Sequence, residues 1–278
     1  MTQTGSYVDL LQECVSTDST NNEAKKLALA GAPHGTTVAA KFQTEGRGRR
    51  GHAWASPQGG VYESIVIRPN VSMQYLQGVT AACALGTVRA LRQLVPQGKF
   101  AVKWPNDVVT PKGKIVGILV EAGYSEQGVF AVCGIGVNAE RPEQVQEHAE
   151  KDKKPIPALE SAYLADECPG QELPCFHDIA AAVQESVLSC IDDWAASITS
   201  KSGVSGPLGP ILDAYYDELV YMNKRCKMYS PEGICLGEAV FAGIDSWGRV
   251  SLINDASKEL IFSPEQVTLR SCDNVLIE

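Results

Sequence analysis

The chain has 278 residues, of which 44% are hydrophobic and 21% charged, and a net charge of −9. At about 150 residues per domain, this length predicts one large domain or two, and the composition excludes a disordered chain. The negative charge disfavours nucleic acid and anionic membranes as partners, so a polyanion would need a local basic pocket. No apolar run approaches the ~18 residues of a membrane span, and no secretory signal begins the chain. We therefore expect a soluble cytoplasmic protein.

The first elements surround a glycine-rich segment. Thr20 and Glu23 fit a capping box, in which a hydroxyl and a carboxylate satisfy free backbone N–H groups. This pattern predicts a helix that begins there and stops at Gly31. Strands rich in β-branched residues are predicted over 36–43 and 61–69.

The middle of the chain reads as one long helix and three strands. Apolar residues recur at helical spacing over 72–95, which predicts a helix that covers one face of a sheet. Strands are predicted over 100–104, 114–123 and 129–138, the last two joined as a hairpin. The stretch 140–177 is rich in Pro, Glu, Lys and Asp, so we expect a surface excursion with at most one short helix.

In the last third of the chain, the predicted elements change from helices to short strands near residue 219. Helices are predicted over 178–197 and 207–219. Short strands then follow at intervals of about ten residues, separated by turn residues, which is typical of a small antiparallel barrel. We therefore predict an α+β protein with a catalytic domain over 1–219 and a barrel over 220–278.

Cysteine and histidine offer no metal or redox motif. The nine cysteines contain no CxxC pair, and Cys83, Cys133 and Cys190 lie in apolar runs, where a free thiol behaves as a small hydrophobe. The four histidines have no metal-binding spacing. We expect reduced structural thiols and no metal held by protein ligands.

The segment GRGRRG at 46–51 literally matches a dinucleotide-binding motif, but its context does not. That motif needs a small-residue helix directly after the glycines, and here His52 begins a stretch rich in Gly, Pro and Ser. A different use fits better, because glycines let backbone N–H groups approach an anion while arginines supply permanent charge. Residues 41–51 carry a local charge of +3. The alternative is a solvated basic loop that touches nothing.

A second signal is KWPND at 103–107, followed by Lys114 at the start of the next strand. The turn residues end one strand, so Lys103, Asp107 and Lys114 are expected at one hairpin end. Turn chemistry with surface lysines is the alternative, but it does not explain the coincidence with an arginine-rich loop.

Together these motifs resemble the biotin protein ligase family. The resemblance rests on GRGRRG with Trp54 downstream, on KWPNDV, on KIVGILVE at 114–121 and on GIGVN at 134–138. It implies a mixed-sheet catalytic domain of the class II synthetase and biotin–lipoate ligase type, followed by an SH3-like barrel. Few residues precede Ser19, so we expect neither the DNA-binding domain of some relatives nor a repressor role.

The resemblance also implies a role for each matching residue. Arg47, Lys114 and Asp107 match the catalytic positions. Arg47 lies in the glycine-arginine loop that orders over biotin and the adenylate. Lys114 contacts the biotin carboxylate and later the adenylate phosphate, and Asp107 lies where the acceptor lysine arrives. Trp54 matches an aromatic that stacks on adenine, although a packing role is the alternative. The implied biotin- and nucleotide-binding positions are Ser19, Thr20, Asn21, Gln43, Gly46, Arg47, Gly48, Arg49, Trp54, Lys114 and Asn138, with Arg270 as a weaker match.

The implied activity is that of a biotin–[biotin carboxyl-carrier protein] ligase. Such an enzyme uses ATP and Mg2+ to convert biotin to biotinyl-5'-AMP and then transfers biotin to a lysine of a carrier domain in a biotin-dependent carboxylase. A second copy of the chain is a candidate partner. Two alternatives stay open: a ligase for lipoate or another short acid, and a non-catalytic regulator that binds biotinyl-adenylate. Asp107 favours an enzyme, because a regulator needs no carboxylate directed at an acceptor.

Overall fold

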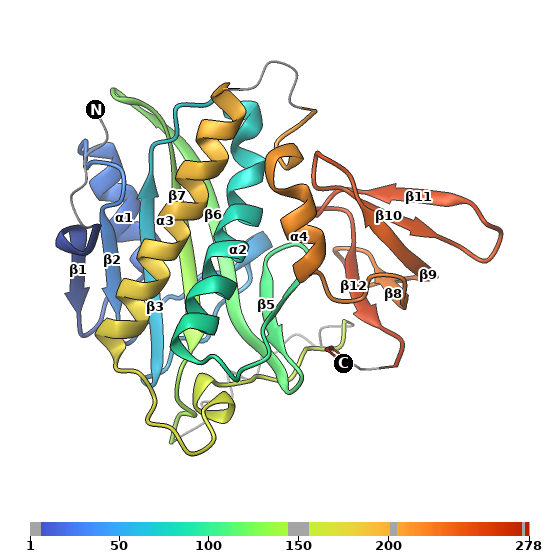
Figure 1. Ribbon diagram of the computed structural model, residues 1–278, viewed down its shortest axis with the longest axis horizontal. Coiled ribbons are helices and arrows are strands. Elements are labelled where there is room, and N and C mark those ends of the chain that lie inside the picture. Colours follow the sequence, from blue (N-terminus) through green and yellow to red (C-terminus); the bar gives the residue numbers. More distant parts are fainter. Residues whose placement is uncertain (1–6, 144–155, 201–204, 274–275, 278) are drawn as a thin grey trace.

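The computed structural model describes residues 7–143, 156–200, 205–273 and 276–277. It contains a seven-stranded sheet in the order β1-β2-β3-β7-β6-β5-β4 and a five-stranded sheet in the order β11-β10-β9-β8-β12 (Figure 1). Strands β1 and β2 run parallel, and the other neighbouring pairs are antiparallel. The fold is mixed α+β, as predicted, and the C-terminal sheet is compatible with an SH3-like barrel.

The larger sheet contains the five strands predicted before residue 140 and two that were not predicted. Its strands are Leu11–Cys14 (β1), Thr37–Ala40 (β2), Gly60–Ile67 (β3), Ala101–Lys103 (β4), Asp107–Thr110 (β5), Gly113–Ser125 (β6) and Gly128–Asn138 (β7). Strand β1 is a half-exposed edge strand with a polar middle, so it lacks the alternation that marks a strand in sequence. Strand β5 begins at Asp107, a residue that we had placed in a turn.

The four predicted helices are present, together with short 3-10 turns. They are Thr20–Leu29 (α1), Gln77–Leu94 (α2), Phe176–Ser200 (α3) and Leu212–Glu218 (α4). The predicted capping box is wrong. Ser19 is the N-cap of α1, the Thr20 hydroxyl instead donates a hydrogen bond to Gln43 Oε1 at 3.0 Å, and Glu23 pairs with Lys26 at 2.7 Å.

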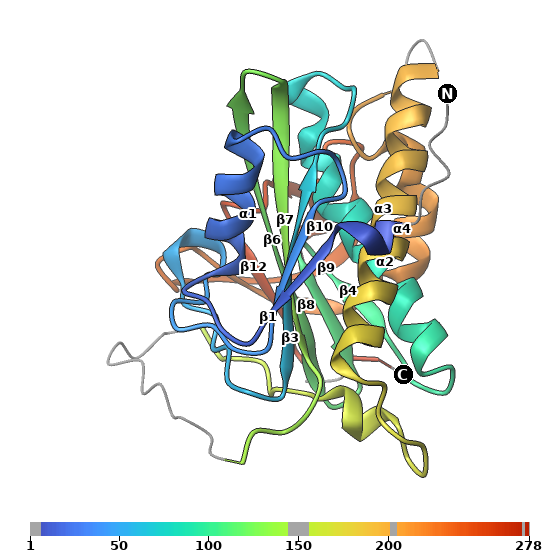
Figure 2. The same ribbon diagram turned by 90° about the vertical axis from the view of Figure 1, so that its left-hand side faces the viewer.

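Helices cover both faces of the larger sheet. Figure 2 shows α1 on one side and α2 and α3 on the other. Because successive residues of a strand point to opposite faces, Ile65 of β3 packs in the core under α2 and α3, while Val66 packs in the smaller core under α1. The α1 face also carries small and polar residues, which leave room there for a cavity.

The smaller sheet is formed by the C-terminal strands and is attached to the first sheet. Its strands are Arg225–Tyr229 (β8), Cys235–Ile244 (β9), Val250–Ile253 (β10), Glu259–Phe262 (β11) and Thr268–Ser271 (β12), all close to the predicted positions. The indole N–H of Trp104 donates to the Gly248 carbonyl at 3.0 Å, and the N–H of Val220 donates to the Val102 carbonyl at 2.9 Å. These contacts join the C-terminal sheet to β4 and the turn after it.

Cys83, Cys133 and Cys190, which lie in apolar runs of the sequence, are buried. All nine cysteines are free thiols, and five of them are buried. Within the described ranges, no helix combines the length and apolar character needed to cross a membrane.

Candidate active site

A cavity of about 730 Å³, the main cavity, opens over the α1 side of the larger sheet. Its lining combines the start of α1, the segment 43–55, strands β5 to β7, residues 156–161 and the edge of the C-terminal sheet. Every predicted site residue except Gly46 contributes to this lining. Segments more than 200 residues apart in the sequence therefore converge on one space.

Gly46 instead stabilises the loop through its backbone. Its carbonyl accepts the Trp54 N–H at 2.8 Å, and a Cβ at this position would overlap Ser56 and the Trp54 backbone. Only glycine allows this close approach, which closes residues 46–54 into a compact loop.

One end of the cavity is a buried network of polar side chains. Gln43 Oε1 accepts hydrogen bonds from the Thr20 N–H at 2.8 Å and the Thr20 hydroxyl at 3.0 Å. Ser64 Oγ lies 2.8 Å from Thr20 Oγ1 and 2.6 Å from Asn21 Oδ1. Asn21 also donates to Glu121 at 2.9 Å. The structure thus brings the predicted Ser19–Asn21 segment and Gln43 together, and it adds Ser64 and Glu121, to which we had assigned no role.

The arginine loop, residues 46–51, sends its three guanidinium groups in different directions. Arg50 has a φ of 56°, a left-handed conformation that turns the chain sharply within Arg49–Gly51. Arg47 forms an ion pair with Glu121. Arg49 donates to Asn106 Oδ1 at 3.1 Å and pairs with Glu265 at 3.1 Å. Arg50 donates to the Pro264 carbonyl. Each guanidinium therefore has protein oxygens as partners, which rules out a loop that touches nothing.

The opposite side of the cavity is a cluster of charges around Asp107. Lys114 Nζ lies 2.6 Å from one carboxylate oxygen, and Lys103 Nζ lies 3.5 Å from the other. Burial acts to raise the Asp107 pKa, but the charges of Lys114 and Lys103 outweigh it and hold that pKa below its ordinary value. Burial lowers the pKa of Lys103 to about 8, against the opposing effect of Asp107. Asp107 is therefore ionised at neutral pH.

Trp54 lies flat on the sheet beside this cluster. A Cβ at Gly117 would come 2.7 Å from the indole ring, and one at Gly136 would come 2.5 Å from the indole nitrogen. The ammonium of Lys114 stands 4.8 Å from the ring centroid, within the range of a cation–π contact. Trp54 thus faces the cavity and is not a residue of either hydrophobic core.

The segment 140–177 is more than a surface excursion, which corrects the expectation from its composition. Its described part returns over the cavity: the Lys114 N–H donates to the Glu160 carbonyl at 2.7 Å, and the Ala162 N–H donates to the Lys114 carbonyl at 2.9 Å. Arg270 Nε donates to the Pro157 carbonyl at 2.7 Å, and Asn138 Nδ2 reaches the Ala162 carbonyl at 3.3 Å. Residues 144–155 of the excursion lie outside the described residues. The expected short helix is the 3-10 turn Leu164–Glu167.

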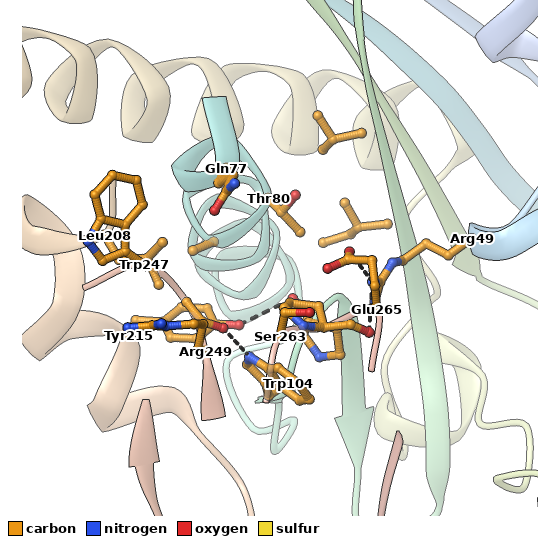
Figure 3. Close-up of a pocket in the computed structure, with 16 residues that line it drawn as sticks. Arg49, Gln77, Thr80, Trp104, Leu208, Tyr215, Trp247, Arg249, Ser263 and Glu265 are labelled. Atoms are coloured by element: carbon orange, nitrogen blue, oxygen red, sulfur yellow. Dashed lines mark hydrogen bonds and ion pairs between the residues drawn. The ribbon is translucent and has the colours of Figure 1, made fainter. Parts of the chain in front are cut away.

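A second cavity, of about 560 Å³, lies on the other side of the arginine loop. It is bounded by the start of α2, the turn after β4 and the C-terminal sheet, and Arg49 lines both cavities (Figure 3). No group of three or more His, Cys, Asp or Glu side chains suited to a metal ion occurs in the described part of the chain.

Comparison with known proteins finds similarity over the first half of the chain. Residues 13–138 match the biotin/lipoate A/B protein ligase family. The biotin–[acetyl-CoA-carboxylase] ligase of Paracoccus denitrificans is 44% identical over 124 residues, which cover 44% of this chain and 51% of that protein. The bifunctional ligase/repressor BirA of Bacillus subtilis is 38% identical over 43% of this chain and 37% of that protein. The chain thus spans about half or less of the length of these curated relatives.

Solved structures give the same fold over nearly the whole chain. The biotin protein ligase from Aquifex aeolicus in complex with biotin and ATP has a TM-score of 0.69 and 22% identity, covering 94% of this chain and 98% of that one. The Leishmania major enzyme in complex with biotinyl-5-AMP has a TM-score of 0.58 and 20% identity, with 91% and 98% covered. The chain is therefore similar to the biotin/lipoate A/B protein ligase family over residues 13–138, and it shares the fold of the biotin protein ligases.

Proposed function

We propose that the chain is an ATP-dependent biotin–[biotin carboxyl-carrier protein] ligase. The observation that carries this proposal is the convergence, at one cavity, of the arginine loop, Lys114 and Asp107 beside the buried network around Thr20 and Gln43. A cavity of this kind offers a polar end, lined by the neutral side chains of Thr20, Asn21 and Gln43, for a small organic ring, and a cationic end for a carboxylate and a phosphate. The biotin and ATP complexes of the structural neighbours support this assignment.

The first step joins two anions. A biotin carboxylate oxygen forms a bond to the α-phosphorus of ATP, and the bond from that phosphorus to pyrophosphate breaks. Negative charge accumulates on the phosphoryl oxygens, so fixed cations lower the barrier. We assign this role to Arg47, Arg49 and Lys114. Each of the three has a carboxylate partner in this structure, so we propose that substrate oxygens share or replace those partners.

In the second step the neutral amine of a carrier lysine forms a bond to the biotin carbonyl carbon of the mixed anhydride. The bond from that carbon to the AMP oxygen breaks, and the amine proton passes to solvent or to the departing phosphate. The ionised state of Asp107 bears on its role here. A carboxylate with a depressed pKa is a poor proton acceptor at neutral pH, so we propose that Asp107 orients the incoming amine rather than removing its proton. Asn138 and Arg270 would act indirectly, through their hydrogen bonds to the 156–162 segment.

The remaining features of the proposal follow the resemblance. Trp54 would stack on adenine, beside the Lys114 ammonium. Mg2+ would arrive with the ATP phosphates, since it needs only one or two protein carboxylates. We further propose a catalytic domain over 1–219 and a C-terminal domain over 220–278, a cytoplasmic location, and a homodimer as a candidate assembly.

The alternatives differ in substrate or in chemistry. A lipoate ligase of the same fold is disfavoured, because the curated relatives compared above are biotin ligases. A non-catalytic regulator is disfavoured by the Lys103–Asp107–Lys114 cluster, which lies beside the cationic end of the cavity and which a purely binding site does not require.

Exchange of labelled pyrophosphate into ATP, measured with biotin or with lipoate as the carboxylic acid substrate, tests the first step. We expect exchange with biotin and Mg2+, and little with lipoate. Exchange supported by lipoate alone would favour the alternative ligase. An absence of exchange with either acid, from protein with a native circular dichroism spectrum, would refute the enzymatic proposal.

A further inference from the structure

The arginine loop is attached to the C-terminal sheet at the turn 263–267, between β11 and β12. Arg49 donates a hydrogen bond to the Pro264 carbonyl at 3.2 Å and pairs with the Glu265 carboxylate at 3.1 Å. Arg50 also donates to the Pro264 carbonyl, and its other terminal nitrogen lies 3.4 Å from the Thr268 hydroxyl. A turn more than 200 residues away therefore accepts hydrogen bonds from two adjacent arginines of the loop.

These contacts lie on the boundary between the two cavities. Figure 3 shows the Arg49 side chain extending to Glu265 at the edge of the second cavity, with Trp104 below and Gln77 and Thr80 of α2 above. From the same guanidinium, Arg49 reaches Asn106 on the turn after β4. Arg49 thus links the arginine loop to the turn after β4 and to the C-terminal sheet at once.

The charges explain why an acidic turn is suited to this position. Arg49 and Arg50 are adjacent cations, and their repulsion opposes the compact form of the loop. Burial lowers the pKa of Arg50 and the neighbouring Arg49 lowers it further, while Glu265 acts in the opposite direction. Glu265 therefore compensates the repulsion that the doubled arginine introduces.

We propose that the 263–267 turn is a latch: Glu265 and the Pro264 carbonyl hold the arginine loop closed over the main cavity. The consequence of the latch rests on the proposed function: a closed loop would retain the biotinyl-adenylate and exclude water from it. The C-terminal sheet thereby sets how long the intermediate stays bound. Glu265 acts through Arg49 and is a positioning residue.

Two measurements on Glu265→Ala test the latch. The first is the rate at which trypsin cleaves after Arg47, Arg49 or Arg50 in the substrate-free protein, located by mass spectrometry. The second is the rate at which preformed biotinyl-5'-AMP leaves the protein. Glu265 has 72% of its side chain exposed, so its removal should leave the melting temperature nearly unchanged. Glu259→Ala is the matched control, because it removes another exposed glutamate of the C-terminal sheet.

An exposed ion pair is weak, and the Pro264 carbonyl remains in the variant. We therefore expect both rates to rise by about two- to fivefold in Glu265→Ala and to stay unchanged in Glu259→Ala. The apparent KM for biotin should also stay unchanged, because Glu265 lies outside the main cavity lining. Raised salt should speed the cleavage of the wild-type loop and reduce its difference from the variant, since salt screens the pair.

The outcomes separate the latch from the proposed function. If the wild-type protein forms no adenylate, the proposed function fails while the cleavage rate still tests the latch. Equal cleavage rates in Glu265→Ala and Glu259→Ala would overturn the latch, whatever the enzymatic result.

Discussion

Glu63 is a carboxyl group buried in the apolar core with no hydrogen-bond partner among the described residues. It lies on β3, opposite Ala39 and Ile135, both of which belong to the core under α2 and α3. Its residue exposure is 1%, and neither carboxyl oxygen has a partner. Its neighbours in sequence, Tyr62 and Ser64, belong to the opposite face of the sheet, and Tyr62 and Glu63 both border the main cavity.

Burial raises the pKa of Glu63 well above its ordinary value of 4.5. The folded protein therefore keeps this proton over a pH range in which the unfolded chain has lost it. The contribution of Glu63 to the free energy of unfolding is fully present below its ordinary pKa. It falls by about 1.4 kcal/mol per pH unit as the pH rises from there toward the folded-state pKa. This single group should therefore lower the free energy of unfolding as the pH rises from the ordinary pKa toward the folded-state pKa.

Glu63→Gln removes the titration while keeping the shape of the side chain. We expect its free energy of unfolding, relative to wild type, to improve as the pH rises above 4.5, at up to about 1.4 kcal/mol per pH unit, as measured by urea denaturation. Glu126→Gln, in the exposed turn between β6 and β7, is the matched control, because it makes the same substitution at an exposed side chain. A pH-dependent gain for Glu63→Gln no larger than that for Glu126→Gln would refute the claim that Glu63 is held protonated in the core.

Three further predictions concern the main cavity. Lys114→Ala should raise the activation barrier of adenylate formation by about 3 kcal/mol, because it removes a cation where charge accumulates. Transfer from preformed adenylate should be affected less, and equal losses in both half-reactions would contradict this role. Trp54→Ala should weaken binding of a non-hydrolysable adenylate analogue by roughly 1–3 kcal/mol in calorimetry. In the same variant, binding of biotin alone and the melting temperature should stay nearly unchanged; equal loss of both ligands would make Trp54 a packing residue. Arg47→Ala should speed release of biotinyl-5'-AMP measured by rapid filtration, because it removes a cation near the phosphate, and an unchanged release rate would count against the assignment.

The parts of the fold that the sequence predicted are those with a strong local pattern. Helix α2 and strands β6 and β7 combine regular apolar spacing with long runs, and the structure contains them close to the predicted positions. The capping box at Thr20 failed because a longer-range partner, Gln43, takes the hydroxyl that would have capped the helix. Tertiary contacts of this kind are invisible to local pattern reading.

In the candidate site, too, the residues with a local motif were predicted and those placed by tertiary contacts were not. The motifs predicted Lys114, Asp107 and the arginine loop as site residues, and the structure places them at one cavity. Glu121 was part of a quoted motif, but its pairing with Arg47 depends on how β6 lies beside the loop. Residues 156–161 carry a composition typical of a surface, and only their backbone hydrogen bonds to Lys114 bring them to the cavity wall.

Transfer of biotin to a carrier domain tests the central claim most directly. The protein would be incubated with biotin, Mg-ATP and a purified carrier domain, and the carrier would be weighed by intact-protein mass spectrometry. We predict a gain of one biotinyl group on the acceptor lysine, absent when that lysine is replaced by arginine and strongly slowed in the Lys114→Ala enzyme. A carrier that stays unmodified, while the protein forms and retains biotinyl-5'-AMP, would contradict a ligase and favour a binding protein.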